Sequence, residues 1–281
     1  MNMSKNGWGW VPTLYFAEGI PYAVVMTLSV IMYKRLGVSN TDIALYTSWL
    51  YLPWVIKPLW SPIVDMLGTR RHWVIAMQWA LAAGFGAVAL ALPLGGWFCL
   101  SLAAFWIVAF LSATHDIAAD GYYMLALSQE RQSFFVGIRT TVYRIAMLTG
   151  QGALVTVAGW IELAHPDSPP HTAWMIVMGV LSGTFVVLAI WHSIILPHPA
   201  ADKMAEKITS LTNVVKEFAG TFVSFFKKPH TAIALLFMLL YRFPEAQLVK
   251  LITPFLLDTP EAGGLGMTTA QVGICYGTVG V

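Results

Sequence analysis

Long, almost uncharged stretches recur along this 281-residue chain and restrict its fold more than any other feature. Six windows each hold about 20 or more mostly apolar residues, enough at about 1.5 Å per residue to cross a hydrocarbon core of about 30 Å. They span residues 10–33, 42–65, 73–93, 97–120, 139–160 and 172–196. A seventh runs from Thr231 to Leu257, and an eighth begins at Thr269. We predict an all-α membrane protein, a six-helix bundle followed by the start of a second bundle, in a chain that is a fragment.

The composition favours a lipid environment and argues against several other classes of protein. Charged residues make up 11% of the chain, against about 25% in ordinary soluble domains. The first window contains Glu18 and is too long for a signal peptide, so it should remain as a membrane helix. A net charge of +2, without a basic run beyond Lys227 and Lys228, gives no reason to expect a nucleic-acid partner. Cys99 and Cys275 form no spacing pattern, and we expect neither a metal site nor a cofactor.

Lysine and arginine residues are unevenly distributed among the connections between the windows. Positive side chains are retained on the cytoplasmic side of a membrane. They occupy alternate connections: Arg70 and Arg71, then Arg131 and Arg139, then Lys203, Lys207, Lys216, Lys227 and Lys228. The other connections are neutral or acidic, except for the pair Lys34 and Arg35. The majority predicts a cytoplasmic N-terminus and a cytoplasmic 197–229 segment.

The chain turns polar between Pro197 and Pro229, which predicts three parts. These are a bundle over 1–196, a linker over 197–229, and helix 7 with the start of helix 8 over 230–281. Within the linker, apolar residues recur at a spacing of three or four: Ile208, Leu211, Val215, Phe218, Phe222 and Phe225. That spacing gives one apolar helical stripe. We expect an interfacial helix that tethers the two bundles, with a regulatory docking site as the alternative.

Two pairs of segments repeat in the same order. LGVSNTDIALY (36–46) matches LGMTTAQVGIC (265–275) in kind at most positions, and LYFAEGIP (14–21) resembles LYRFPEAQ (240–247). Duplicated halves that are joined after six helices by a cytoplasmic linker resemble the organisation of the major facilitator transporters. This resemblance implies that helices 1, 4 and 7 line a central cavity, whereas helices 3 and 6 lie outside against lipid.

The ionisable residues inside the windows follow that plan. A charge at the centre of a membrane helix costs about 2.5 to 3.5 kcal/mol, so such residues should face the interior. Windows 3 and 6 carry only His192 near one end, whereas the other windows hold Glu18, Lys57, His115, Asp116, Asp120, Arg144, Arg242, Glu245 and Lys250. Polar side chains that share a helical face are Tyr15 with Glu18 and Tyr22, Asp116 with Asp120, and Arg242 with Glu245. These faces could contact a polar solute.

Helices 4 and 5 form a hairpin that offers each acid a cation. Counted outward from the turn, Asp120 and Arg139 lie about equally deep, and Asp116 matches Arg144. All four could be structural ion pairs, which an ionised carboxylate near hydrocarbon requires. Alternatively, Asp116 or Glu18 exchanges a proton during a transport cycle.

Two further residues of these helices have open interpretations. His115 could share the proton role or be a satisfied packing histidine, and with Asp120 it also has the H-x-x-x-x-D spacing of some membrane acyltransferases. Lys57 has Trp54 and Trp60 three positions to either side, so aromatic faces could hold its ammonium group. It either balances Glu18 or Asp116 or binds an anionic substrate.

The segment after the second window is SPIVDMLGTRR (61–71). It resembles the D-x-x-G-x-R-R part of the major facilitator loop motif, with Ser61 in place of the usual leading glycine. In that family the motif acts at the cytoplasmic gate, and the resemblance assigns this role to Asp65 and Arg70. We group Arg139, near the same end of its helix, with this gate.

Three motifs narrow the resemblance: YFAEGIPY on helix 1, KPLWSPIVD on helix 2 and HDIAADGYY on helix 4. Together they resemble the AmpG-type muropeptide permeases, a branch related to acetyl-coenzyme A transporters. The resemblance implies a monomeric, proton-driven importer of anhydromuropeptides in the bacterial inner membrane, rather than an enzyme. Another anionic solute such as an acyl-coenzyme A is the alternative, and a membrane sensor or acyltransferase is less favoured.

The resemblance also implies roles in substrate binding and proton coupling for residues of these helices. Lys57, Asp116 and Asp120 stand within the matching motifs and inherit candidate roles in substrate binding or proton coupling. Carboxylates of a peptide need cations such as Lys57, Arg144 or Arg242. Sugars suit tyrosine faces and amide donors, which Tyr15, Tyr22 and Gln151 could supply, and Glu245 stands beside Arg242 on the seventh helix.

Overall fold

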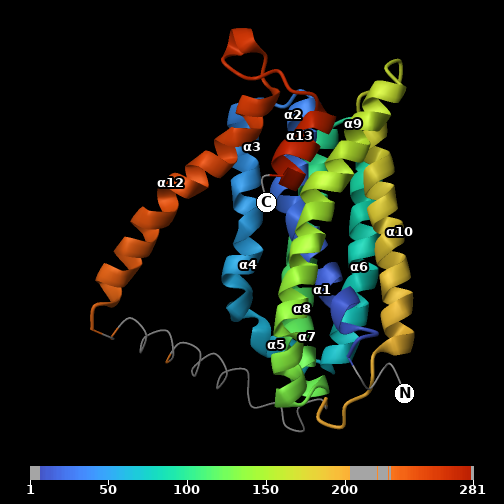
Figure 1. The fold of residues 1–281 in the computed structure, drawn as a ribbon, viewed down its shortest axis with the longest axis vertical. Coiled ribbons are helices and arrows are strands. Elements are labelled where there is room, and N and C mark those ends of the chain that lie inside the picture. The colour runs from blue at the N-terminus through green and yellow to red at the C-terminus, as the bar shows by residue number, and fades with distance from the viewer. Residues whose placement is uncertain (1–6, 203–219, 221–226, 228, 280–281) are drawn as a thin grey trace.

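The computed structural model describes residues 7–202, 220, 227 and 229–279, and it contains only helices and loops over that part of the chain. Six helical spans there are long and apolar enough to cross a membrane (Figure 1). The first consists of α1 (Val11–Ala23), the π-helical turn η2 (Val24–Leu28) and α2 (Ser29–Arg35). The next three are α6 (Arg70–Ala91), α7 (Trp97–Ala126), and α8 (Gln129–Leu148) continued by the π-helical turn η5 (Thr149–Ala153) and α9 (Leu154–Ala164). The last two are α10 (Thr172–Ile195) and α12 (Thr231–Leu257).

The second apolar window is a broken helix, where the sequence led us to expect one continuous span. It divides into α3 (Asn40–Ser48), η3 (Trp49–Tyr51), α4 (Leu52–Ile56), η4 (Lys57–Leu59) and α5 (Ser61–Met66). Pro53, Pro58 and Pro62 each stand at the start of one of the last three pieces. Proline has no backbone N–H and clashes with the preceding turn, so it fits best in the first turn of a helix.

The bundle has two ends, named from their places in Figure 1. The upper end holds residues 36–39, 92–96, 165–171 and 258–268, and the lower end holds 67–69, 127–128 and 196–202. α12 contacts α2 and α13 (Thr269–Ile274) near the upper end, and its lower half stands away from the other spans. α13 is followed by the π-helical turn η7 (Cys275–Val279), and η6 (Pro260–Ala262) lies in the preceding loop.

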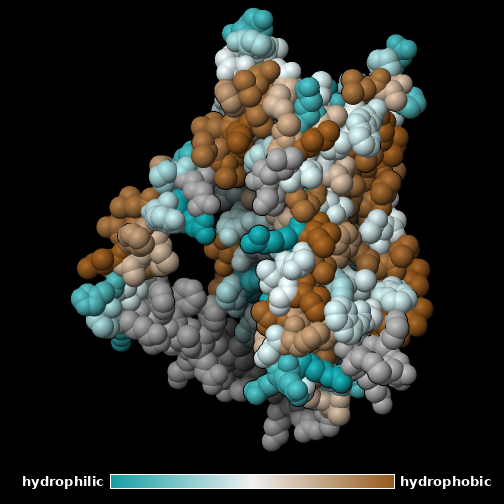
Figure 2. Space-filling model, in the orientation of Figure 1, coloured by the Kyte–Doolittle hydropathy of each residue, from teal (hydrophilic) through white to brown (hydrophobic). Residues whose placement is uncertain are grey.

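The helix at the centre of the bundle is α1, which packs closely on α8. A Cβ at Gly19 would lie 2.8 Å from the Cβ of Ala146, and one at Gly150 would lie 2.6 Å from the Cβ of Ala23. Small residues four positions apart allow this approach, as is common between membrane helices. Large apolar side chains instead remain exposed on the outside of the bundle, and Figure 2 shows them along α10 and α12. The lipid phase covers such surfaces.

The predicted internal repeat is confirmed at the starts of α3 and α13. Gly37 and Gly266 both have positive φ, +84° and +64°, a conformation that glycine adopts without strain. Two residues later, Ser39 and Thr268 cap the two helices by accepting a hydrogen bond from the backbone N–H three positions on. Pro21 and Pro244 likewise lie inside α1 and α12. The proposed linker helix falls largely on residues outside those that the structure describes.

Candidate functional site

An acid–base cluster lies between the broken helix and α1, α7 and α8. The break at η4 carries Lys57, whose Nζ donates to the Asp116 carboxylate on α7 at 2.7 Å. The Asp116 side chain retains 15% of its exposure and that of Lys57 retains 34%. The pair is therefore withdrawn from bulk solvent on the Asp116 side.

Asp120, one turn further along α7, has two partners. The Tyr15 hydroxyl on α1 donates to Asp120 Oδ1 at 3.0 Å, and Arg139 of α8 forms an ion pair with the same oxygen at 3.4 Å. The guanidinium also lies over the ring of Tyr15, 4.6 Å from its centroid, and over that of Tyr123 at 5.3 Å. Cation–π contacts of this kind favour a fixed arginine. The Asp120–Arg139 pair that the hairpin geometry predicted is confirmed.

Glu18 completes the cluster from α1 and is 9% exposed. Its carboxyl group lies near that of Asp116, and its Oε2 is enclosed without a hydrogen-bond partner among the described residues. Two carboxylates close together repel each other, which favours a proton on one of them. The group of Glu18, Asp116 and Lys57 holds two acids and one ammonium, so it is electrically neutral only when one of the acids carries a proton.

Three predicted contacts of this region are wrong. Asp116 pairs with Lys57 and not with Arg144, whose side chain is exposed and has no ion pair within the described part of the chain. The Lys57 ammonium also does not lie over indole rings. Trp54 packs against Tyr22 with ring centroids 5.2 Å apart, and the Trp60 indole donates to Thr114 at 3.2 Å. The Lys57 ammonium instead pairs with the Asp116 carboxylate.

His115 belongs to a different network on the far side of α7. Its Nε2 lies 3.0 Å from the Gln78 amide nitrogen, the Gln78 oxygen lies 2.9 Å from His192 Nδ1, and His192 Nε2 lies 2.9 Å from the Thr13 hydroxyl. Both imidazoles and Gln78 are buried, and His115 Nδ1 has no partner among the described residues.

This network also rules out the acyltransferase arrangement in the structure. Five positions separate His115 from Asp120, about 140° around the helix axis. Asp120 accordingly faces Tyr15 and Arg139, while His115 faces Gln78. The two side chains therefore form no catalytic pair.

A cavity of about 640 Å³ opens onto the cluster near the lower end, and it is lined by Lys57, Asp120 and Arg70 among others. The Arg70 guanidinium donates to the Ile117 carbonyl at 3.0 Å and packs against Gly121, where a Cβ would collide with it. Asp202 accepts the backbone N–H groups of Arg70 and Arg71. The gate partner assigned to Arg70, Asp65, lies on α5, and its side chain is outside the described part of the structure.

A second cavity, of about 230 Å³, brings together two predicted binding residues, Tyr22 and Gln151. Its lining is completed by Met26, Thr27, Val30, Met147, Val249, Thr253 and Tyr276. Arg242 is exposed on α12 and is not among the described residues that line either cavity. The side chains of its neighbours Glu245 and Lys250 lie outside the description.

Polar contacts at the upper end join α2, α3 and α9 to α13 and to Asp258, the residue that follows α12. Lys34 forms an ion pair with Asp258, and Asn40 donates to the same carboxylate at 2.9 Å. Hydrogen bonds from Lys34 and then Asn40 hold the pKa of Asp258 below its usual range. Lys34, which is an exception to the alternating distribution of positive residues, thus has an acidic partner nearby.

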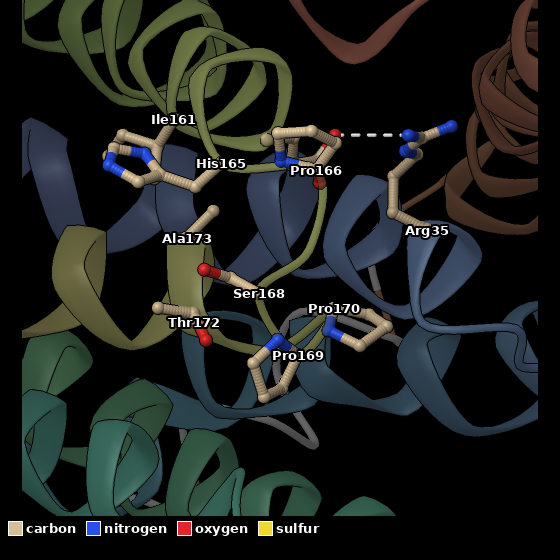
Figure 3. A pocket seen from close by; sticks show the side chains of 10 residues that line it. Arg35, Ile161, His165, Pro166, Ser168, Pro169, Pro170, Thr172 and Ala173 are labelled. Carbon is tan, nitrogen blue, oxygen red and sulfur yellow. Dashed lines mark hydrogen bonds and ion pairs between the residues drawn. The ribbon is translucent and has the colours of Figure 1, made fainter.

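Glu162 at the end of α9 makes the second such contact. It pairs with Arg35 at 3.0 Å and accepts from the Thr269 hydroxyl at 2.7 Å. Figure 3 shows Arg35 reaching toward α9 beside a cavity of about 200 Å³ lined by the 165–170 loop. Arg35, like Lys34, therefore has an acidic partner at this end.

Several residues of these sites were missed by sequence reasoning. Gln78, Glu162 and Asp258 carry no periodic or motif signal in the sequence. Thr253 of α12 and Tyr276 of the π-helical turn η7 also line the second cavity, and no local sequence pattern indicates such a turn. The internal repeat was the one sequence signal available for this region, because it matches the start of α3 to the start of α13.

Comparisons with known proteins agree with this architecture. Residues 18–243 match the profile of the BT1 family. The chain is 27% identical over 277 residues to "Putative transporter AmpG 4" of Rickettsia conorii, covering 93% of this chain and 61% of that protein. It is 26% identical over 280 residues to "Anhydromuropeptide permease" of Escherichia coli, covering 95% of this chain and 51% of that one.

The chain therefore spans about half to three-fifths of the length of these curated relatives. The predicted resemblance to AmpG-type permeases is confirmed. The match to the family profile extends from Glu18 in α1 to Phe243 in α12, so it includes the whole acid–base cluster. On this evidence the chain belongs to the BT1 family.

Proposed function

We propose that this protein is a secondary transporter that imports anhydromuropeptides across the bacterial inner membrane together with protons. The observation that carries the proposal is the Glu18–Asp116–Lys57 group. Its two acids lie close together, and its single ammonium lies 2.7 Å from Asp116. Protonation of Asp116 in this group would break its ion pair with Lys57.

The coupling follows from charge balance. When Asp116 is ionised, it holds Lys57, and an approaching carboxylate must compete with it. When Asp116 takes the proton, Lys57 loses its partner and becomes available to a carboxylate of the substrate. An unpaired charge at this depth is costly, so substrate binding and protonation favour each other.

The cavity near the lower end supports an anionic substrate. Lys57 and Arg70 both line it, with Asp120 held by Tyr15 and Arg139. A muropeptide combines carboxylates with sugar rings, and the relative from Escherichia coli is named for that class. The positive-inside distribution of arginine supports a cytoplasmic N-terminus, and we propose that the lower end faces the cytoplasm.

The test is uptake of a labelled anhydromuropeptide into right-side-out membrane vesicles. A proton uncoupler should abolish accumulation. Asp116→Asn should insert normally and fail to accumulate the label, because asparagine fills the same volume and cannot carry the proton. The matched control is Asp167→Asn, an exposed acid in the 165–171 loop, which should transport at the wild-type rate.

Two outcomes would contradict the proposal. Accumulation that resists the uncoupler would remove proton coupling. Competition by coenzyme A esters, without competition by unlabelled muropeptide, would assign the cavity to another class of anion.

A further inference from the structure

Three π-helical turns from three different spans converge on the 230 Å³ cavity. Thr27 comes from η2, Gln151 from η5 and Tyr276 from η7, and all three line it. π-helical turns are rare and occur mostly as single turns at functional sites, because the extra residue widens the helix and redirects side chains. Convergence of three on one cavity indicates a site built for a ligand.

The lining of this cavity differs in chemistry from that of the acid–base cluster. Its polar groups are the phenols of Tyr22 and Tyr276, the amide of Gln151, and the hydroxyls of Thr27 and Thr253. No carboxylate, ammonium or guanidinium is among the described residues that line it. The Gln151 side chain is 9% exposed, and its oxygen accepts from Thr27 only at 3.4 Å. A buried amide with one long hydrogen bond can bind a further polar group.

The cavity adjoins the acid–base cluster along α1. Tyr22 follows Glu18 by four residues, about 6 Å along the helix axis and on the same face. It packs edge-on against Trp54 of α4, whose centroid lies 5.2 Å away. One ligand could therefore contact the neutral cavity and Lys57 together.

We infer that this cavity binds the sugar part of the substrate, so that the molecule lies with a neutral ring toward the upper end and its carboxylates toward Lys57. This inference rests on the proposed function. Sugars present hydroxyl and amide groups at their edges and C–H groups on their faces. The cavity supplies partners for both: five polar side chains and two tyrosine rings. Its 230 Å³ equals the volume of roughly eight water molecules at about 30 Å³ each, which suits one substituted ring rather than a whole muropeptide.

The cavity is also closed by both halves of the chain. Tyr22 and Gln151 precede the 197–229 segment, whereas Thr253 and Tyr276 follow it. A sugar ring bound there contacts both halves at once. Its binding is then coupled to their relative arrangement, as alternating access requires.

The test compares two fragments of the substrate on the whole protein in membranes. One probe is an uncharged N-acetylated aminosugar disaccharide, and the other is a free stem peptide with its carboxylates. Inhibition of labelled muropeptide uptake gives an apparent affinity for each. Gln151→Ala and Tyr276→Phe should each weaken the sugar probe about tenfold, the loss expected for one or two hydrogen bonds to buried groups. Their effect on the peptide probe should stay within about twofold.

Two variants serve as controls. Thr149→Val alters the same π-helical turn as Gln151 but lies outside the cavity lining, and it should leave both affinities unchanged. Lys57→Ala, whose uptake is too low for the inhibition assay, is tested by direct binding of each labelled probe, and it should weaken the peptide probe and spare the sugar probe.

The outcomes separate the inference from the proposed function. Equal weakening of both probes by Gln151→Ala, or an unchanged sugar affinity, would overturn the sugar assignment while transport stands. Failure of the wild type to be inhibited by muropeptide or by either probe would reject the proposed function and the inference with it.

Discussion

His115 and Asp116 are neighbours in the sequence and belong to two unlike networks on different faces of α7, about 100° apart around its axis. His115 enters a chain of neutral groups with Gln78 and His192, which ties α7 to α6, α10 and α1. Asp116 enters the ionic group with Lys57 and Glu18. One helix thus carries a network of neutral hydrogen bonds and an ionic group whose charge, we propose, changes during transport.

The difference shows how a membrane protein separates structure from function. The neutral chain pairs Gln78 with both imidazoles and requires no charge to balance, and His115 Nδ1 has no partner among the described residues. The ionic group balances only when one proton is present. Stability should therefore depend on the first network, and transport and its pH dependence on the second.

Lys57→Ala should have the largest effect, because it leaves Asp116 and Glu18 without a cation. Loss of one partner of a buried pair costs about 3 to 5 kcal/mol, so we expect uptake to fall by about a hundredfold or more. The measurement is the initial uptake rate per inserted protein. The double variant Lys57→Ala with Asp116→Asn should recover stability and remain inactive. Recovery of uptake by the double variant would show that Lys57 has only a structural role.

Gln78→Leu should have an intermediate effect, on stability rather than transport. It leaves an imidazole nitrogen of both His115 and His192 unpaired, at about 1 to 3 kcal/mol for each buried group. The melting temperature in detergent should fall, whereas Gln129→Leu at an exposed glutamine should not lower it. Uptake per folded molecule should keep its pH profile. A shifted profile would connect the neutral chain to proton coupling and break the comparison.

Asp258→Asn should have the smallest effect, because this ion pair lies at the surface of the upper end. Its contribution should be below about 1 kcal/mol. Since Lys34 and Asn40 lower the pKa of Asp258, the contribution is complete above the ordinary carboxyl pKa of about 3.9 and is lost as the pH falls through the lower folded value. Melting curves from pH 7 to pH 3 should thus separate wild type from variant at neutral pH and converge in acid. A constant difference would mean that the carboxylate charge contributes nothing.

The sequence predicted the position of a residue along its helix better than the face of the helix on which its side chain lies. Hydrophobic length located six of the seven full windows as single spans, and depth counting paired Asp120 with Arg139. The same counting failed for Asp116, because a lysine from another helix lies closer than Arg144. Tyr22 and Gln151 do share a cavity, although their predicted role in substrate binding stays a prediction.

Other features had no local signal in the sequence. The π-helical turns arise from packing between helices, and the partners of His115 depend on which helices surround α7. The broken second helix could have been predicted from Pro53, Pro58 and Pro62, which follow one another at intervals of five and four positions. Hydropathy alone does not reveal these breaks.

The broken helix makes the two members of the central ion pair mechanically unequal. Asp116 rides on α7, a continuous rod of 30 residues and about 45 Å. Lys57 lies in the short turn η4 of the broken helix, between two short helices, α4 of five residues and α5 of six. Lys57 can therefore move away from Asp116 without bending of a long helix. The exchange of partners at Lys57 that we propose needs only local backbone movement.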